Sequence, residues 1–547
     1  MKNSIKYLLL LLVALLSSCT GPVEHNEAKK AMVFSAKLNG VEMSTSKHLA
    51  GQNADDVVFS IEFSTEVDIE KFNPFSIVFS GGELDICYGE NHKVIELRPK
   101  KQISYFTSYT LTLLPFEHLG VKLVDTYKYS FSTCYDPSDK FERISDDELL
   151  TLVQEQTFKY FWDYAHPVSG LARERLGSGE TVTSGGSGFG IMTIPVGIER
   201  GFITREEGAE RMAVIADFLL NKAERFHGAY SHWLDGTTGK AKAFSTKDDG
   251  GDLVETAFLI AGLLTVQQYF CQDNPTEKAI RDDVQTIWES VDWTWYQNGQ
   301  DALFWHWSPN HDWAMNMHIS GWNEGLIVYV LAASSPTHPI TKEVYDNGWA
   351  RNGGMRNGKE YYGIKLPLGS DKGGPLFFTH YSFLGLDPRG LSDAYADYWE
   401  QNVAHTRINH AYCKANPKKY AGYSDECWGL TASDIPNSYT ASSPTNDKGT
   451  IAPTAALSSM PYTPEESMKA LRYFYYVLGV RLFKEYGFRD AFNLSSSWFA
   501  SSYIAIDQGP IVVMIENYRT GLLWDNFMKN EDVQKGLARL GFTYGKE

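Results

Sequence analysis

The feature that most constrains the fold is a change in hydrophobic period near residue 140. Between residues 32 and about 133, apolar side chains alternate with polar ones, as they do at 57–63. Further along, Leu150, Val153 and Phe158 recur at helical spacing. A period of two places side chains on one face of a strand, and a period of 3.6 places them on one face of a helix. The sequence therefore predicts a β domain followed by a helical domain, with a short linker between them.

The predicted β domain covers residues 32–135. Its strand-like segments are residues 57–63, 75–79, 86–88, 94–97, 109–113 and 127–131. Short strands at such spacing favour a sandwich of about seven strands. This portion resembles the bacterial Ig-like modules found on surface enzymes, which implies a spacer. A carbohydrate-binding role stays open, because fold does not imply function.

The predicted helical domain covers residues 145–543. Some helices are apolar all round and must be covered on every side, whereas others have one polar face and lie outside. Alternating inner and outer helices, about twelve in all, would form an (α/α)6 toroid whose inner helices open on one shared cavity. No exact repeat is visible, so this prediction rests on helix count and burial pattern. The predicted helices are 146–163, 204–226, 252–270, 274–298, 320–333, 339–348, 392–415, 464–485, 510–527 and 531–541, with shorter ones near Phe378 and Ile451.

The N-terminus is typical of a targeting signal. Two lysines precede an apolar run at residues 8–16, and the sequence Leu-Ser-Ser-Cys ends at Cys19. The run is short for a membrane span and fits a signal-peptide core. Its end resembles a bacterial lipobox, which implies a signal peptide at 1–19, lipidation of Cys19 and a polar tether at 20–31. We therefore expect an outer-membrane lipoprotein facing the periplasm or the cell surface; plain secretion with cleavage elsewhere is the alternative.

Charge and cysteine content exclude some classes of protein. The net charge of -17 argues against a nucleic-acid partner, which would call for a basic face. Of the five cysteines after Cys19, Cys87 and Cys134 could pair within the β domain, but the sequence does not decide this. No CxxC or Cys/His zinc spacing occurs, so no metal site is predicted.

Carboxylates stand ahead of apolar helices in three places. Residues 247–255 carry four acids, a second stretch ends in Glu324, and a third contains Asp507. Cleavage of a sugar chain needs two carboxyl groups that face each other across the sugar. These acids are therefore candidate catalytic groups for a carbohydrate-cleaving cleft; the four in the first stretch are Asp248, Asp249, Asp252 and Glu255.

Helix capping is the alternative reading of the same acids. Asp252 and Glu255 have the spacing of a capping box, and Asp507 can cap the helix that Pro510 opens. Taken singly, each acid is more often a cap than a catalyst. Four acids, however, exceed what one cap requires. Glu324 lies beside Trp322 and an apolar run, where burial raises the pKa of a carboxyl group, as a proton donor requires.

Aromatic residues and glycines complete the candidate site. The 14 Trp and 31 Tyr can form an aromatic core or, in part, stack on sugar rings. His306 lies among tryptophans and is expected to bind sugar hydroxyls, as are His311 and His318. The glycine-dense stretch 185–190 has no nucleotide-binding register, so we expect a loop beside the cleft and no nucleotide cofactor.

Five motifs in the helical domain together resemble the glycoamylase-like family. That family includes the endo-β-1,2-glucanases of glycoside hydrolase family 144, and a similar domain occurs in cyclic β-1,2-glucan synthases. The resemblance implies an (α/α)6 barrel and an inverting hydrolase without a cofactor; action on starch does not follow from the family's name. The motifs are Gly251–Phe258, Gly321–Glu324, Cys427–Asp434, Ile451–Ala455 and Asp507–Pro510.

Carried over by position, the resemblance also implies roles for single residues. Glu324 would be the general acid and Asp507 the favoured general base. Asp248 and Glu255 would hold the substrate or tune the acid, and either could replace Asp507 as the base. The loops at 170–190, 300–318 and 430–450 would set the substrate. The implied substrate-binding residues are Trp322, Trp428, Trp305, Phe189, His306 and Asp252.

The sequence thus predicts a monomeric inverting hydrolase of a β-glucan, with β-1,2 linkages favoured, or of its oligosaccharides. Membrane contact is expected only through the lipid anchor. One alternative is a non-catalytic glycan-binding surface lipoprotein, which would tolerate loss of the acids. Another is a polysaccharide lyase, which would need a Tyr or His base and a cation for a uronate. The retained acids favour the hydrolase. Chain-end preference cannot be read from the sequence.

Overall fold

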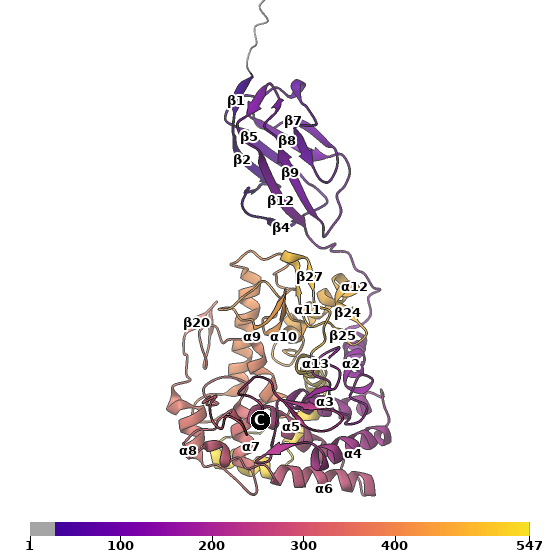
Figure 1. The fold of residues 1–547 in the computed structure, drawn as a ribbon, viewed down its shortest axis with the longest axis vertical. Helices are drawn as coiled ribbons and strands as arrows, with labels where there is room; N and C mark the ends of the chain where they lie inside the picture. The colour runs from indigo at the N-terminus through magenta and orange to yellow at the C-terminus, as the bar shows by residue number, and fades with distance from the viewer. Residues whose placement is uncertain (1–27, 546–547) are drawn as a thin grey trace, which may run out of the picture. The chain divides into compact units, whose positions relative to one another are not determined.

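The computed structural model describes residues 28–545, which form two compact units divided after Cys134 (Figure 1). The predicted signal peptide, Cys19 and most of the tether lie outside the described residues. The predicted end of the tether is wrong, because β1 (Lys29–Ala31) pairs in parallel with β11 (Val121–Leu123). This pairing satisfies backbone groups that a tether would leave to water.

The first unit contains two main sheets that share one core. Along β5, alternate residues are buried, and the Phe59 ring centroid lies 5.3 Å from that of Phe79 and 5.6 Å from that of Phe131 in the other sheet. The predicted strand segments 86–88 and 94–97 are confirmed, and they pair antiparallel as β7 (Leu84–Tyr88) and β8 (Val94–Pro99). The five-stranded sheet is β3 (Val41–Glu42), β2 (Val33–Leu38), β5 (Phe59–Phe63), β8 (Val94–Pro99) and β7 (Leu84–Tyr88). The four-stranded sheet is β4 (Leu49–Gln52), β12 (Tyr127–Thr133), β9 (Ser108–Leu113) and β6 (Ile77–Phe79).

A small third sheet and the cysteines complete this unit. The third sheet runs β1, β11 and β10 (Glu117–His118). Cys87 is exposed and carries a free thiol, so the disulfide with Cys134 that the sequence allowed is not formed.

The second unit is helical, and its inner helices are buried along almost their whole length. Two of them, α5 and α7, are almost wholly apolar, and such a helix is stable only when others surround it. Contacts link α13 to α3, α3 to α5 and α5 to α7. The inner helices are α3 (Ser184–Glu199), α5 (Leu253–Tyr269), α7 (Leu326–Ser334) and α13 (Ala505–Arg519).

Outer helices with polar faces cover the inner ones, which confirms the predicted alternation of buried and amphipathic helices. Contacts join α2 to α13, α4 to α3, α6 to α5 and α15 to α7. The outer helices are α2 (Asp146–Trp162), α4 (Arg205–Asn221), α6 (Pro275–Glu289), α9 (Tyr398–Ala415), α11 (Pro464–Arg472) and α15 (Glu531–Leu540).

The prediction of a loop at 185–190 is wrong, because these residues belong to α3. The glycines let α3 and α5 approach each other closely: a Cβ at Gly188 would lie 2.2 Å from the carbonyl oxygen of Phe258. A Cβ at Gly262 would lie 2.3 Å from the carbonyl oxygen of Gly188. Tertiary packing thus outweighs the low helix propensity of glycine.

Shorter elements connect the helices. The predicted helix at 320–333 begins only at Leu326, because residues 320–325 form the turn that carries Glu324. Among the described residues, no helix has the length and hydropathy to cross a membrane. Short helices are α8 (Lys342–Val344), η5 (Leu376–Thr379), η6 (Tyr381–Phe383), α10 (Pro453–Leu457), α12 (Gly479–Leu482) and α14 (Leu522–Phe527), and π-helical turns are η3 (Tyr345–Trp349) and η7 (Tyr473–Val477).

Short strands lie between the helices near their N-terminal ends. One sheet is β13 (Thr181–Thr183), β16 (Trp233–Asp235) and β17 (Ala241–Lys242). Two-stranded pairs are β18 (Gly251–Asp252) with β19 (His306–Trp307), and β22 (Ala432–Ile435) with β23 (Ser438–Ala441).

Candidate active site

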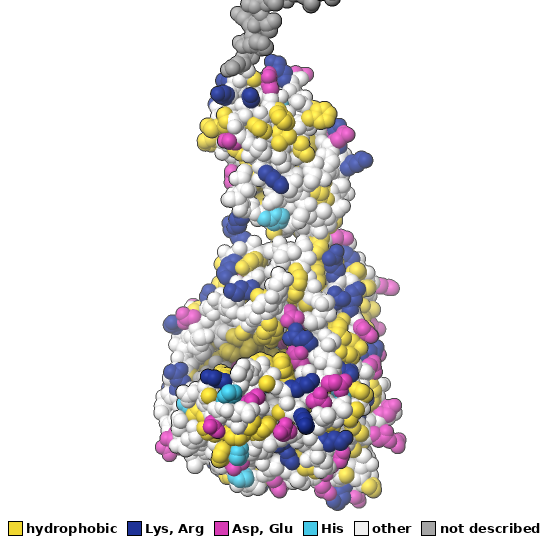
Figure 2. Space-filling model, viewed as in Figure 1, with side chains coloured by type: hydrophobic (Ala, Val, Ile, Leu, Met, Phe, Trp, Pro, Cys, Tyr) yellow, Lys and Arg dark blue, Asp and Glu magenta, His cyan; other side chains and the backbone are white. Residues whose placement is uncertain are grey.

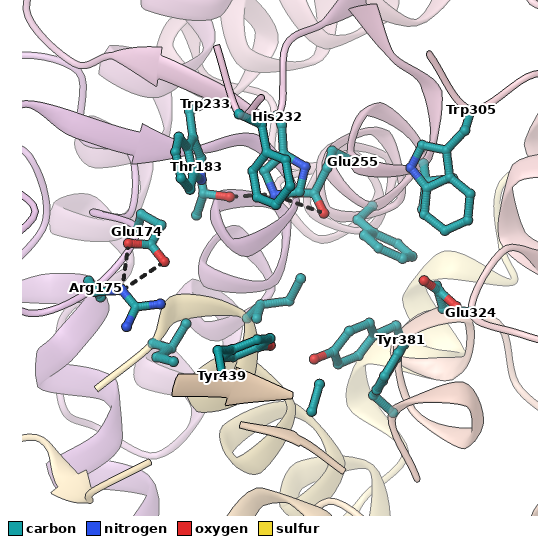
Figure 3. A pocket seen from close by; sticks show the side chains of 17 residues that line it. Glu174, Arg175, Thr183, His232, Trp233, Glu255, Trp305, Glu324, Tyr381 and Tyr439 are labelled. Carbon is teal, nitrogen blue, oxygen red and sulfur yellow. Dashed lines mark hydrogen bonds and ion pairs between the residues drawn. The ribbon is translucent and has the colours of Figure 1, made fainter. Parts of the chain in front are cut away.

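The helical unit has a cavity of about 360 Å³. Figure 2 shows the hollow in its surface, with hydrophobic side chains inside. Glu255 and Glu324 both line it, together with aromatic residues (Figure 3). They come from different elements, the first turn of α5 and the turn before α7. The structure therefore brings two of the predicted catalytic acids to one cavity.

Glu324 lies in a part of the cavity wall where burial is the main influence on the pKa of its carboxyl group. Desolvation raises the pKa of the Glu324 carboxyl to about 7, and the negative charges of Glu255 and Asp252 add to this. Ser382 fixes the turn from behind, because its hydroxyl donates to the carbonyl of Glu324 and accepts the amide of Ile327 at 3.0 Å. A carboxyl group that keeps its proton near neutral pH is suited to general acid catalysis.

Glu255 stands in a polar part of the wall. Its Oε2 accepts the backbone N–H of Gly185 at 2.8 Å and the hydroxyl of Thr183 at 3.4 Å. Gly185 lies in the first turn of α3, where free N–H groups and the helix dipole favour a negative charge. Burial still raises the pKa of Glu255, while the positive charge of His232 and the bond from Gly185 act to lower it.

Asp252 is the buried N-cap of α5, as the capping reading predicted. Its Oδ1 accepts the N–H groups of Val254 and Glu255, both at 3.0 Å. Its Oδ2 lies 3.1 Å from Nδ1 of His232. Asp252 does not line the cavity, so it contacts His232 rather than filling the substrate-binding role predicted for it.

His306 and Asp248 form a second imidazole–carboxylate pair nearby. Nε2 of His306 lies 3.0 Å from Oδ2 of Asp248 and 3.6 Å from Oδ2 of Asp252. Neither His306 nor Asp248 lines the cavity, and each is less than a tenth exposed. The pair therefore acts behind the wall, and the predicted direct contact of His306 with sugar finds no support.

The closest approach to a metal-ligand grouping among the described residues is His232, Asp248 and Asp252, whose possible ligand atoms lie within 4.8 Å of one another. In each histidine, however, a ring nitrogen faces a carboxylate oxygen at hydrogen-bond distance. We assign these contacts to imidazole–carboxylate hydrogen bonds rather than to a metal site.

Asp507, the favoured base, lies behind the cavity wall. It is 1% exposed and does not line the cavity, although its charge acts on Tyr381 and Tyr439, which do. Burial and the neighbouring Asp490 carboxyl raise the pKa of Asp507 well above its usual range. A neighbouring carboxylate and burial both disfavour the ionised form of Asp507.

A charged network connects this carboxyl pair to the cavity. The backbone N–H of Asp434 donates to Oδ2 of Asp490 at 2.7 Å. The Asp434 carboxylate in turn accepts from Arg175 at 3.2 Å, and Arg175 lines the cavity beside Glu174. The sequence marked Asp434 within one motif, but Asp490, Glu174 and Arg175 lie outside every motif.

Three of the four predicted stacking residues are not at the cavity. Trp428, Trp322 and Phe189 are 0%, 6% and 1% exposed. Trp428 donates its indole N–H to the carbonyl of Glu466 at 3.2 Å, and Phe189 packs behind Tyr381 with ring centroids 5.1 Å apart. They belong to the core, because apolar inner helices require large side chains around them.

Trp305 does line the cavity, as predicted. Sequence reasoning missed the other aromatic lining residues, of which Phe258 alone falls within a motif: Trp233, Phe244, Phe258, Phe377, Tyr381 and Tyr439. Each of the three predicted substrate-setting segments reaches the cavity, through Arg175, Trp305 and Tyr439 respectively.

Known proteins resemble this chain, several of them over about three quarters of its length. A family model described as "Putative glucoamylase" matches residues 316–531. An exo β-1,2-glucooligosaccharide sophorohydrolase (non-reducing end) from Parabacteroides distasonis is 50% identical over 420 residues, which are 73% of this chain. The chain spans 58% of the length of that curated relative.

Two solved structures are also similar. An endo-β-1,2-glucanase from Chitinophaga pinensis, in complex with sophorotriose and glucose, is 53% identical with a TM-score of 0.72. The match covers 74% of this chain and 99% of that one. A β-1,2-glucanase from Parabacteroides distasonis is 41% identical with a TM-score of 0.71, over 94% of this chain and 73% of that one.

Proposed function

The chain belongs to the glycoamylase-like family of glycoside hydrolases, and from this premise we propose that it hydrolyses β-1,2-glucan or its oligosaccharides. The names of its relatives support the β-1,2 linkage. The observation that carries the proposal is that Glu324 and Glu255 line one cavity beside Trp305. Most glycoside hydrolases use two carboxyl groups that flank the scissile bond, and an aromatic ring offers a flat apolar surface to a sugar.

We propose an inverting mechanism. Glu324 gives its proton to the glycosidic oxygen, and the C1–O bond breaks with its electron pair on that oxygen. A water molecule forms a bond to C1 from the opposite face, and its proton passes to a carboxylate base. This arrangement requires carboxyl groups roughly 6.5–9.5 Å apart, so that the water fits between them. Solvent then returns a proton to Glu324 and removes one from the base.

Two carboxyl groups compete for the role of base. Asp507 is favoured by the family resemblance, and Glu255 by its place on the cavity wall. Asp248 is a weaker third candidate because it is tied to His306 behind the wall. Azide separates them: in the variant that lacks the base, azide replaces the water and yields an inverted α-glucosyl azide. We expect one of Glu255→Gln and Asp507→Asn, and not both, to be rescued in this way.

Proton NMR of fresh product tests the reaction itself. Hydrolysis of β-1,2-glucan by inversion yields the α-anomer first, and the β-anomer accumulates only by mutarotation. Initial formation of the β-anomer would exclude inversion. A panel of linkage-defined glucans tests the substrate. If the protein cleaves no 1,2 linkage in this panel, the proposed substrate is excluded.

For the fold, we propose an (α/α)6 toroid behind an Ig-like β-sandwich. Six outer–inner pairs follow in chain order: α2 with α3, α4 with α5, α6 with α7, α8 and η3 with η5 and η6, α9 with α10, and α11 with α13. The inner members are the more deeply buried of each pair. The two-sheet core of the first unit supports the Ig-like assignment.

For localisation, we propose a monomeric outer-membrane lipoprotein anchored through Cys19. The lipobox-like sequence supports this proposal. Metabolic labelling with a palmitate analogue should mark the wild-type chain and not Cys19→Ala. If neither protein is labelled, the lipid anchor is excluded. Light scattering of the protein without its lipid anchor measures its mass, and a value of twice the chain's mass would exclude the monomer.

A further inference from the structure

His232 is a cavity-lining side chain that no sequence motif marked. It stands between β15 (Ala229–Tyr230) and β16, and its ring stacks on Phe244 with centroids 4.2 Å apart. Nδ1 faces Oδ2 of Asp252 at 3.1 Å. Asp252 is fully buried and its other oxygen already accepts two backbone N–H groups. The tautomer of His232 is therefore set, with a proton on Nδ1 that points to Asp252.

The other ring nitrogen of His232 faces Glu255. Nε2 lies 4.0 Å from Oε1 of Glu255, and Figure 3 shows the dashed lines from Glu255 to His232 and to Thr183. The bonds from Gly185 and Thr183 hold Oε2. A Cβ at Gly185 would lie 2.4 Å from Oε2, so only glycine permits this approach. Glu255 is thus clamped at one oxygen and paired with an imidazole at the other.

The charges around this pair favour an imidazolium. Asp252, Glu255 and Asp248 face His232, and each raises its pKa; burial opposes them, and the pKa of His232 rises to about 9. His306 is the neighbouring base, and Asp248 and Asp252 raise its pKa as well. Glu255 in turn faces Asp252 and acts on Glu324 and Tyr381. A cation beside Glu255 favours its ionised form, since opposite charges stabilise each other in a low-dielectric site.

We propose that His232, oriented by Asp252, is a positioning residue that keeps Glu255 ionised and thereby leaves the proton of the acid pair on Glu324. The inference rests on the proposed glycoside hydrolysis for its catalytic meaning. In this proposal the imidazolium of His232 is the reason that Glu255 is ionised while Glu324 is protonated.

The pH profile of His232→Gln tests the proposal. Glutamine keeps the size and a hydrogen-bond donor but removes the cation, so Glu255 should bind a proton at higher pH. We expect the acid limb of kcat to move up by about one pH unit, with KM nearly unchanged. His232→Lys, which retains a cation, should return part of that shift. His338→Gln is the control, because the side chain of His338 is 40% exposed and does not line the cavity. An unmoved acid limb in His232→Gln would overturn the proposal.

A second measurement does not depend on turnover. In histidine-labelled protein, the imidazole signal of His232 is identified by its loss in His232→Gln. We expect it to stay protonated above neutral pH and to titrate about one unit lower in Glu255→Gln. A neutral His232 at pH 7 would overturn the proposal. So would an imidazole signal that appears only with an added divalent cation and vanishes with EDTA, because His232 would then be a metal ligand. If the imidazolium is seen but no glucan is cleaved, the proposed function fails and the charge pair stands.

Discussion

The cavity has two contrasting walls. Around Glu324 desolvation dominates, and the carboxyl keeps its proton to a pKa of about 7. Around Glu255 the wall is polar: a helix N-terminus, a hydroxyl and an imidazole surround the carboxylate. Burial raises the pKa of both carboxyl groups, but Glu255 alone has an imidazole and backbone and hydroxyl donors that favour its charged form. Pairs of acids whose environments push their pKa values apart are typical of acid–base catalysis.

The largest expected effect comes from replacing the Glu324 carboxyl group, which carries the proton that general acid catalysis requires. Glu324→Gln should lower kcat by about 10²–10⁴-fold, because a positioned general acid contributes that much. KM should change little, since the amide fills the same space. Steady-state kinetics on β-1,2-glucan measures both, and normal turnover would remove Glu324 from the acid role.

A side chain at Gly185 should disrupt the hydrogen bonds that hold Oε2 of Glu255. Gly185→Ala places a methyl group 2.4 Å from Oε2 of Glu255, so the carboxylate must leave its bond to the amide of residue 185. We expect a loss of roughly 2 kcal/mol in the free energy of unfolding, even though alanine favours a helix over glycine by about 1 kcal/mol. Urea unfolding measures this, and a stabilised variant would contradict the clamp.

The Glu324 wall should also make stability depend on pH. Its folded pKa of about 7 exceeds the usual 4.5, so its contribution is fully present below pH 4.5 and is lost as pH rises through about 7. Compared with Glu324→Gln, the wild type should lose roughly 2 kcal/mol between pH 4.5 and 8, after allowance for solvent in the cavity. Urea unfolding of both proteins across this range measures the difference. A constant difference would mean that Glu324 is not desolvated.

The smallest expected effect concerns the ring beside Glu324. Trp305→Ala should admit water and lower the pKa of Glu324, moving the alkaline limb of kcat/KM to lower pH by about half a unit. Loss of stacking should raise KM about tenfold. Trp295→Ala is the control, because Trp295 is 39% exposed and does not line the cavity. If Trp305→Ala and Trp295→Ala change KM and the pH profile equally, Trp305 does not contact the substrate.

The sequence predicted the elements whose cause is local. The inner helices α5 and α7 are apolar on all sides, and this pattern alone requires burial. α3 was missed because its glycines oppose a helix by propensity, and only the close approach of α5 explains them. Glu324 and Glu255 were found because they stand just before or in the first turn of such helices.

The rest of the site depends on contacts between distant segments. His232 lies 20 residues before its partner Asp252, in a segment with no pattern of its own. Trp428 was misplaced because an aromatic ring in a motif suits a core as well as a sugar. Residues that differ only in what packs against them look alike in a single sequence.

The most direct test is the infrared spectrum of the protonated carboxyl groups. The account predicts that the difference spectrum of wild type minus Glu324→Gln contains a carboxylic C=O band up to about pH 7, since any band from the buried Asp507 and Asp490 is common to both proteins and cancels. Glu255→Gln should retain this band, because Glu255 is ionised. If instead the band is lost in Glu255→Gln and kept in Glu324→Gln, the two walls have the opposite roles and the account is wrong.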